Sequence, residues 1–447
     1  MFTKPSLSPD TAVAGAIALH GGAGDYDALL DMIGDAHFVL LGEATHGTHE
    51  FYEERARITQ RLVSEKGFCA VAVEADWPDA YRVNRYVRAQ SRDASAAASL
   101  DGFQRFPNWM WRNTDVVAFV DWLRDYNDSR GEAGKIGFYG LDLYSLFTSI
   151  DEVLRYLDQV DPAAAREARA RYACFDHYDE DGQQYAYATS FGMSDSCESD
   201  VVAQLQALQL RALDYMRQDG TEASDAYFYA QQNARLVKNA EEYYRTMLRG
   251  RVSSWNLRDR HMAETLDALS VHLSARAQEP AKIVVWEHNS HIGDARATEI
   301  GQQGEWNIGQ LARERYGKRA FLLGFTTHGG WVTAASRWDG VADRKRVLPA
   351  LPGSYEELFH RSGPARFLLP LGPGSPAAAA LPGRQLERAI GVLYLPQSER
   401  QSHYFNAHLS AQFDAVIHID ETDAVQPLEL IGRGQGGEVP ETYPVGV

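Results

Sequence analysis

Short, uninterrupted apolar runs alternate with helical patterns along the chain. Runs rich in Val, Ile, Leu and Phe occupy residues 37–43, 68–76, 135–142, 282–289 and 319–327, and "RFLLPLG", "AIGVLY" and "AVIHID" follow later. Because these runs do not alternate with polar positions, they are typical of strands buried on both faces. The helical segments between them indicate crossover connections. We therefore predict an α/β fold with a mostly parallel central sheet flanked by helices.

The middle of the chain follows a different pattern. Between residues 146 and 277 the sequence shows no convincing strand, whereas apolar residues recur at helical spacing. One such stripe contains Leu236, Ala240, Tyr243 and Met247, and another contains Met262, Leu266 and Leu269. We predict a mainly helical insertion lobe at 146–277, which forms one wall of a cleft. The α/β core then consists of residues 1–145 and 278–447, and the Ala/Pro/Gly stretch at 371–385 is expected to be a surface loop.

Composition and charge narrow the possible partners. The 447 residues are 45% hydrophobic, which is enough for a substantial core, and 61 acidic residues outnumber 44 basic ones, giving a net charge of -17. This excess disfavours nucleic acid and anionic lipid as partners. No apolar run reaches about 18 residues, so no membrane span is expected. The three cysteines form no CxxC pair, so we expect neither a disulfide framework nor a thiolate zinc site, in a cytoplasmic protein.

Four of the predicted strands end in acidic residues. These are Glu43, Glu74 with Asp76, Asp142, and Glu287. A single acid after a strand is usually a helix cap or a loop residue. In an open α/β sheet, however, ligands bind outside the carboxyl ends of the strands, so four such ends predict one cleft with crowded ionisable groups.

Histidines accompany two of these acidic strand ends. His46 lies three residues after Glu43, with His49 close behind, and His288 and His291 follow the strand at 282–289. A lone histidine is most often a hydrogen-bonded structural residue. Two clusters of histidines and acids at the ends of different buried strands favour a functional site, because such crowding shifts pKa values toward neutrality.

Arg55 is predicted to point inward. If a helix begins near Thr48, then Phe51, Ile58 and Leu62 form one apolar stripe, and Arg55 is its only charged member. One interpretation is a guanidinium that reaches water while its stem packs. The other places it beside the strand-end carboxylates, where it pairs with them or holds a substrate oxygen.

An aromatic cluster and the helical lobe supply candidate substrate contacts. The segment "GFQRFPNWMWRNTD" contains Phe106, Trp109, Met110 and Trp111 before a helix expected to be capped near Thr114 or Asp115. Such aromatics either pack in the core or form the apolar wall of a pocket for a bulky ligand. Arg258, in "SWNLRDRHM", either reaches the cleft from the lobe or forms an ion pair within it.

Several familiar motifs are absent from the sequence. It contains no GxSxG nucleophile elbow, no Walker A loop and no HExxH helix.

Two histidines near the C-terminus are not assigned to the site. His403 and His408 are expected to be structural, in a helix packed beneath the sheet edge.

The sequence blocks together resemble the erythromycin esterase family of hydrolases. The blocks are "LLGEATHGTHEFYEERARITQRLV", "AVAVEADWP", "FPNWMWRN", "WEHNSHIGD" and "SHYFNAHLSAQFDAVIHID". The resemblance extends over nearly the whole chain and is closer to the broad bacterial homologues than to the enzymes that open macrolide lactones in antibiotic resistance. It implies an α/β core with a helical lobe and an esterase acting on a small-molecule ester or lactone.

The resemblance also implies roles for individual residues. His46 would be the general base that activates water without a covalent intermediate, Glu43 would orient the imidazole or the water, and Glu74 would complete the acidic side. Arg55, His288 and His291 match the remaining polar positions and would stabilise the oxyanion or protonate the leaving group. No cofactor is expected.

Three alternatives remain open. His288 and His291 with Glu43 or Glu74 offer ligands for a catalytic divalent metal. A cleft lined by histidines and aromatics would also suit a protein that binds a large ligand such as haem without turnover. Finally, the substrate can be an ester or amide outside the macrolides, and oligomeric state does not follow from the sequence.

Overall fold

The computed structural model describes residues 12–178, 182–216, 220–381 and 383–429. Its central feature is a nine-stranded sheet with the order β1-β8-β11-β6-β2-β5-β3-β4, in which β7 pairs with β6. The strands are β1 Ile17–Ala18, β2 Phe38–Leu41, β3 Ala70–Asp76, β4 Gly137–Asp142, β5 Ile283–Trp286, β6 Ala320–Ala334, β7 Asp343–Val347, β8 Arg366–Pro370 and β11 Ala415–Thr422.

The strands from β11 to β4 pair in parallel, as the sequence predicts. Within the described part of this sheet, β1 with β8, β8 with β11, and β7 with β6 are the antiparallel pairs. Leu41, the last residue of β2, lies opposite Trp286 of β5 and Leu323 of β6. The carboxyl ends of β2 and β5 therefore lie at the same edge, and the predicted α/β class is confirmed.

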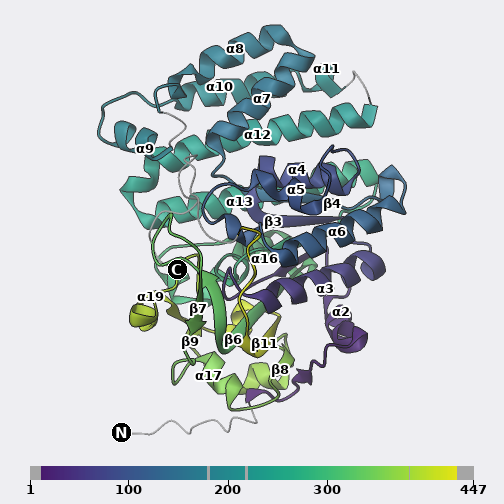
Figure 1. Cartoon of the computed structure of the whole chain (residues 1–447), viewed down its shortest axis with the longest axis vertical. Helices are drawn as coiled ribbons and strands as arrows, with labels where there is room; N and C mark the ends of the chain where they lie inside the picture. The colour runs from purple at the N-terminus through teal and green to yellow at the C-terminus, as the bar shows by residue number, and fades with distance from the viewer. Residues whose placement is uncertain (1–11, 179–181, 217–219, 382, 430–447) are drawn as a thin grey trace.

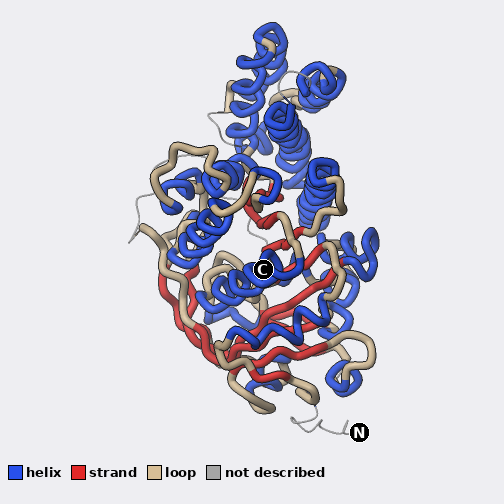
Figure 2. Tube along the Cα trace, turned by 90° about the vertical axis from the view of Figure 1, so that its right-hand side faces the viewer, coloured by secondary structure: helices blue, strands red, loops and turns tan. Residues whose placement is uncertain are grey.

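Both faces of the sheet are covered, which explains the uninterrupted apolar runs. Leu40 and Val285 belong to one hydrophobic core, and their neighbours Val39 and Val284 belong to the other. Helices α3 (His49–Lys66) and α6 (Thr114–Asp128) cover the second of these cores, whereas α13 (Arg251–Ala277) and α16 (Ile308–Tyr316) cover the first. Figure 2 shows the strands between these helical layers.

Helix α3 follows the prediction closely. Thr48 is its N-cap residue, and it ends at Gly67, whose left-handed φ of 73° favours glycine. Phe51, Arg55, Ile58 and Leu62 are all buried, so the arginine does point inward. Helix α6, by contrast, is capped by Asn113, whose side chain accepts from the Val116 amide, and not by Thr114 or Asp115.

The remaining core helices are short, apart from one. They are α2 Asp27–Ile33, α4 Trp77–Val87, α5 Ala96–Ser99, α14 Asn289–Ile292, α15 Glu299–Gln302, α17 Tyr355–His360, α18 Pro376–Ala380, α19 Glu399–Ser402 and α20 Leu409–Gln412. The stretch at 371–385, for which the sequence predicts a surface loop, contains helix α18. Ser375 caps this helix, and Pro376 suits its first turn.

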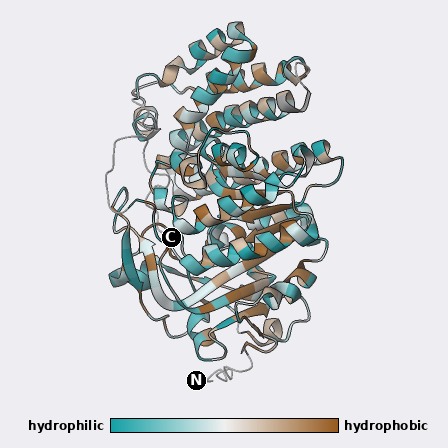
Figure 3. Ribbon diagram, turned by 45° about the vertical axis from the view of Figure 1, so that its right-hand side comes forward, coloured by the Kyte–Doolittle hydropathy of each residue, from teal (hydrophilic) through white to brown (hydrophobic). Residues whose placement is uncertain are grey.

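Helices fill the segment between β4 and β5. They are α7 Leu146–Val160, α8 Pro162–Tyr172, α9 Gly182–Ser190, α10 Glu198–Leu210, α11 Ala212–Met216, α12 Gly220–Thr246 and α13, and the described residues of this segment contain no strand. Helices α7 to α12 extend from the sheet at the top of Figure 1, and in Figure 3 they carry hydrophilic and hydrophobic residues together. Both predicted apolar stripes are buried.

Two local predictions fail near the C-terminus. "AIGVLY" does not join the sheet; Ile390 and Leu393 form isolated bridges with Thr45 and Ala335. Ile390 and Tyr394 pack against Val332 and Ala334 of β6 and Val347 of β7, so the segment is buried although it does not pair as a strand. Likewise, His403 precedes strand β10 (Tyr404–Ala407), which pairs with β9 (Gln385–Arg388), and not a helix. Short apolar runs do not distinguish these cases by pattern alone.

The expectation that the cysteines form no disulfide is also wrong. Cys174 and Cys197 form a disulfide within the helical lobe, whereas Cys69 is free. Cys174 follows α8, Cys197 precedes α10, and the fold of the lobe brings them together, which a count of cysteines does not show. Within the described part of the chain, none of the helices is both long and apolar enough to cross a bilayer.

Candidate active site

The turn after β2 is held by backbone hydrogen bonds from several directions. The Asn289 amide donates to the Glu43 carbonyl at 2.9 Å, and the Ile390 amide donates to the Ala44 carbonyl at 2.8 Å. The Thr333 amide donates to the Gly47 carbonyl at 3.0 Å. These bonds anchor the turn to the loop after β5, to "AIGVLY" and to β6. They therefore fix the backbone from which the side chains of the turn extend.

Two glycines let this turn approach its neighbours. A Cβ atom at Gly42 would overlap the side chain of Asn289, and one at Gly47 would overlap the backbone of Thr333. The glycines in "GEATHG" are therefore required by close packing of backbone and side chain, independently of any chemistry.

His46 and Glu43 form a buried pair on this turn. Nδ1 of His46 lies 2.8 Å from Oε1 of Glu43, and the other carboxylate oxygen, Oε2, lies 2.6 Å from Nη2 of Arg55. The guanidinium of Arg55 also lies 4.4 Å from the ring centre of Tyr52, whose hydroxyl donates to the His46 carbonyl at 2.9 Å. Glu43 is thus fixed from both sides, and the His46 proton belongs on Nδ1.

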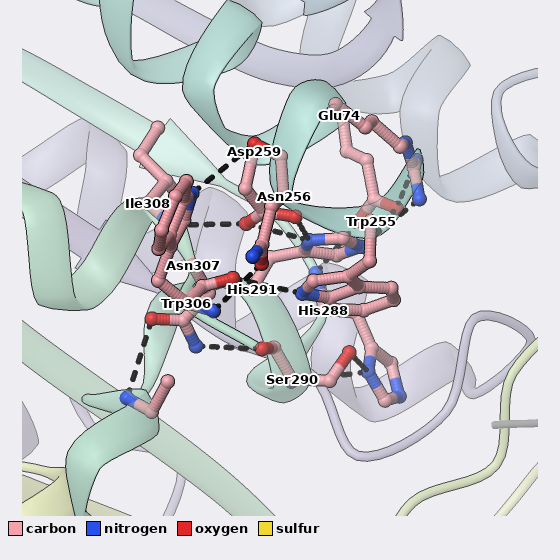
Figure 4. Close-up of polar contacts among 12 residues, drawn as sticks. Glu74, Trp255, Asn256, Asp259, His288, Ser290, His291, Trp306, Asn307 and Ile308 are labelled. Atoms are coloured by element: carbon pink, nitrogen blue, oxygen red, sulfur yellow. Dashed lines mark hydrogen bonds and ion pairs between the residues drawn. The ribbon is translucent and has the colours of Figure 1, made fainter. Parts of the chain in front are cut away.

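His288 lies against this pair from the neighbouring strand. Its ring centre is 4.8 Å from that of His46. Its Nδ1 caps helix α14 by accepting from the Ser290 amide at 3.2 Å, as Figure 4 shows. Because Nδ1 is an acceptor, Nε2 carries the proton, and this buried atom has no hydrogen-bond partner. The arrangement leaves one donor free beside His46.

Arg258 joins the ends of β3 and β4. Its Nη2 lies 2.8 Å from Oε1 of Glu74 and 2.6 Å from Oδ2 of Asp142, and its Nε donates to Oδ1 of Asp142 at 3.0 Å. The other oxygen of Glu74 accepts from the His288 amide at 2.8 Å. Arg258 therefore reaches the strand ends from α13 of the lobe and is not paired within it.

His291 is enclosed by polar and aromatic partners (Figure 4). Its Nδ1 lies 3.0 Å from both carboxylate oxygens of Asp259, and its Nε2 lies 3.1 Å from Nη1 of Arg258 and 3.4 Å from Glu74. Trp255 stacks on the ring with a centroid distance of 4.5 Å. Both nitrogens and one face of His291 are therefore occupied.

Burial and neighbouring charges set the protonation states of this cluster. Burial opposes ionisation of Glu74, but His291, Arg258 and His46 outweigh it and lower its pKa. Burial, followed by the charge of His46, holds the pKa of His288 well below its ordinary value. A charged carboxylate and a neutral imidazole thus lie side by side.

Glu287 differs from the other strand-end acids. Burial raises its pKa well above the ordinary value, and the carboxylates of Glu74 and Asp259 add to the effect. Neither of its carboxyl oxygens has a hydrogen-bond partner. Its surroundings therefore favour the neutral, protonated form of Glu287 over the carboxylate.

The structure brings together most of the predicted site residues but gives them unequal access. Glu43, His46, Arg55, Glu74, Arg258, His288 and His291 belong to two adjoining networks. Of these, His46 is the most exposed at 7%, whereas Arg55 is 1% exposed and paired with Glu43. Arg55 therefore does not reach water, and its guanidinium pairs with the strand-end carboxylate of Glu43.

The predicted aromatic wall is mostly buried. Trp109, Met110 and Trp111 are at most 4% exposed and belong to a hydrophobic core, and only Phe106 is half-buried. Nε1 of Trp111 donates to the Glu74 carbonyl at 3.2 Å. Trp111 therefore supports the end of β3. None of the three side chains lines an open surface, because most of their area packs against apolar neighbours.

Some residues of the site were not selected from the sequence. The sequence marks Asp142 only as a strand-end acid, and it does not mark Asn289 or Trp255 as site residues. Asn289 locks the two loops together, because its amide group also bonds Phe325 of β6 through Nδ2 at 2.7 Å. An asparagine or tryptophan in a helical pattern carries no signal of such a role. For Asp142, its position at the end of a strand is the signal.

The proposed metal ligands do not form a set. Both nitrogens of His291 are engaged by Asp259 and Arg258, and the guanidinium beside it would repel a cation. Nδ1 of His288 is engaged by Ser290. The donor geometry at these strand ends therefore suits acid–base chemistry better than joint coordination by His288 and His291.

An acid–base cluster thus lies at the carboxyl edge of a mostly parallel α/β sheet, and Arg258 of α13 pairs with its acids. The comparison with known families adds to this picture. The family model for erythromycin esterase matches residues 63–422, and the chain belongs to this family. The match includes Glu74, Arg258, His288 and His291 and begins after His46. Membership supports a hydrolytic enzyme.

Individual relatives are distant. Erythromycin esterase type II from Escherichia coli is 23% identical over 320 residues, 69% of this chain and 73% of the relative. A succinoglycan biosynthesis protein has a similar structure, with a TM-score of 0.75 and 21% identity over 95% of this chain and all of that one. A histidine-to-asparagine mutant of erythromycin esterase EreC, in its open conformation, has a TM-score of 0.66 and 19% identity over 91% and 95% of the chains. These structures show the shared fold.

Proposed function

We propose that this protein hydrolyses an ester or lactone of a small molecule with His46 as the general base. The observation that carries the proposal is the pairing of His46 Nδ1 with Glu43, which leaves Nε2 as a lone-pair acceptor. Nε2 takes a proton from water as the oxygen attacks the acyl carbon, and Glu43 stabilises the imidazolium that forms. The proton then passes to the departing alkoxide, so the net change is the gain of one water.

His288 supplies the second part of this chemistry. The tetrahedral intermediate carries negative charge on the former carbonyl oxygen and needs a donor in a site with little water. Nε2 of His288 is such a donor, because it carries a proton, lacks a partner and belongs to a ring 4.8 Å from that of His46. A neutral imidazole donates without competing for the proton that His46 removes.

The proposed class of substrate is supported by the family to which the chain belongs, and not by the residues around the cluster. The Escherichia coli relative is named as an erythromycin esterase, so a macrolide lactone is one candidate. The buried aromatic cluster gives no further support for a bulky substrate. Other lactones and esters are therefore equal candidates, and localisation in the cytoplasm stays a proposal.

The test is hydrolysis of a panel of macrolides, other lactones and simple esters, followed by mass spectrometry for gain of one water, with and without chelator. His46→Asn is expected to lose about 10²- to 10⁴-fold in rate on the best substrate. His20→Asn is the control, because His20 is exposed and lies outside the cluster. An unchanged rate in His46→Asn would refute the assigned base, and binding without turnover across the panel would contradict hydrolysis.

A further inference from the structure

Three side chains with metal-ligating atoms meet away from the strand-end cluster. His328 comes from β6, His360 is the last residue of α17, and Asp420 lies on β11; one ligand atom of each is within 4.8 Å of the others. Among the described residues this is the only group of histidine, cysteine and acidic side chains with such spacing. Figure 1 shows α17, β6 and β11 together at the lower end of the molecule, opposite the helical lobe.

His328 has an unexplained polar atom. Its Nδ1 is buried and has no hydrogen-bond partner. Its backbone is fixed, because its carbonyl accepts from Nη2 of Arg388 at 2.7 Å and from the Ala350 amide at 3.0 Å. A buried ring nitrogen without a partner is costly, and a bound ion or water is the usual explanation.

Asp420 is supported in the way that metal-binding carboxylates are. Its Oδ1 lies 2.7 Å from Nδ1 of His360 and 3.6 Å from Nε2 of His418. His418 is fully buried, and its Nδ1 lies 2.9 Å from the hydroxyl of Thr326. Carboxylate ligands commonly have such outer partners, which fix their orientation.

We propose that His328, His360 and Asp420 bind a divalent first-row transition cation, for which Zn²⁺ is the probe. Two imidazoles and one carboxylate suit this class of ion, and water fills the remaining positions. The site connects α17 to β6 and β11, so the ion stabilises this end of the sheet and takes no part in chemistry at His46. The proposal is independent of the proposed hydrolysis.

Binding requires one ring to turn. The rings of His328 and His360 are stacked, with centroids 3.7 Å apart and planes within 8°. Each nitrogen lone pair lies in its ring plane, so one ion cannot lie in both planes of a parallel stack. The side chain of His360 is 44% exposed at the end of its helix, which gives it room to rotate toward Asp420 and His328.

The test is calorimetric titration with Zn²⁺ after chelator treatment and dialysis of the full chain. We expect one Zn²⁺ per chain, a fall in affinity of at least about 10-fold in His360→Asn, and no change in the control His20→Asn. Zn²⁺ should raise the melting temperature of the wild type but not of His360→Asn. The exposed position of His360 allows the variant to fold, which its melting temperature without metal verifies.

Two results would overturn the proposal. One is the absence of saturable Zn²⁺ binding to the wild type, which would leave a stacked, hydrogen-bonded histidine pair as the role of the cluster. The other is equal affinity in wild type and His360→Asn, which would place the ion elsewhere. Asp420→Asn provides a second variant, because it keeps the shape of the side chain and removes the charge.

Discussion

The imidazole rings of His46 and His288 lie 4.8 Å apart, with one proton fixed on Nδ1 of His46 and one on Nε2 of His288. Glu43 sets the first tautomer and the Ser290 amide sets the second. The first ring therefore presents an acceptor and the second a donor, which is the pairing that attack by water on a carbonyl requires.

Replacing Glu43 with Gln should lower the rate of hydrolysis without removing the base. The amide can donate to Nδ1 of His46, which moves the ring proton to Nε2, and it cannot stabilise the imidazolium. We expect a fall in kcat of about 10²- to 10⁴-fold with little change in KM. Steady-state kinetics on the substrate found by the panel measures this effect.

The control for this variant is Glu53→Gln. Glu53 lies on α3 and pairs with Arg57 in a half-exposed setting. It should leave kcat unchanged. A Glu43→Gln enzyme with full activity would show that His46 needs no oriented tautomer, and the proposed mechanism would have to be abandoned.

Gly47→Ala should reduce activity without altering any ionisable group. The added Cβ overlaps the Thr333 backbone and pushes the turn that carries His46 away from β6. Overpacking of this kind costs about 1–3 kcal/mol in stability. Melting temperature and kcat together measure the effect.

Gly131→Ala is the matched control for that substitution. Gly131 has no atom within 4 Å of the added Cβ, and its φ of -69° suits any residue. It should leave both stability and kcat close to wild type. If Gly47→Ala behaved in the same way, the turn would not be held against β6 as the structure shows.

The sequence predicts where the acid–base cluster lies, because the carboxyl ends of parallel strands meet at one edge of the sheet. The apolar run before Glu43 and the run before His288 identify β2 and β5, which are neighbours in the sheet. The inward position of Arg55 also follows from helical spacing. Both predictions follow from the periodicity of helices and strands, which can be read from a single sequence.

The partners within the site could not be predicted in this way. Whether Arg258 pairs inside the lobe or with Glu74 depends on how α13 packs on the sheet, and whether Trp109 lines a pocket depends on what covers it. Both are tertiary contacts between distant segments. The spacing of apolar residues carries no information on them.

Glu74→Gln should be destabilising at neutral pH. Arg258 pairs with two buried carboxylates, those of Glu74 and Asp142, and the substitution removes the charge of the first. Breaking a buried ion pair costs about 3–5 kcal/mol in stability. Because the pKa of Glu74 is lowered on folding, its contribution is present above the unfolded pKa of about 4.5 and is lost as pH falls. The variant should therefore lose less stability than the wild type on acidification.

Urea unfolding of both proteins at about pH 7 and about pH 3 measures this difference. Glu65→Gln is the control, because Glu65 pairs with Arg61 on the surface of α3 and should have little effect. Equal stability of wild type and Glu74→Gln at neutral pH would mean that the carboxylate does not hold Arg258 at the end of β3.

The stability of the wild type should also fall between neutral and alkaline pH because of His49. Its Nδ1 lies 2.8 Å from Oδ1 of Asp115, and this hydrogen bond outweighs burial and raises the pKa of His49 to about 9. A raised pKa stabilises the folded state fully below the unfolded value of 6.5, and the stabilisation is lost as pH rises to about 9. The side chain is 42% exposed, so solvent reduces the effect.

His49→Gln should therefore lose less stability than the wild type between about pH 6 and about pH 10, as measured by urea unfolding. Other groups that titrate in this range contribute equally to both proteins, so identical losses would show that His49 and Asp115 do not form a charged pair at the start of α3 and α6.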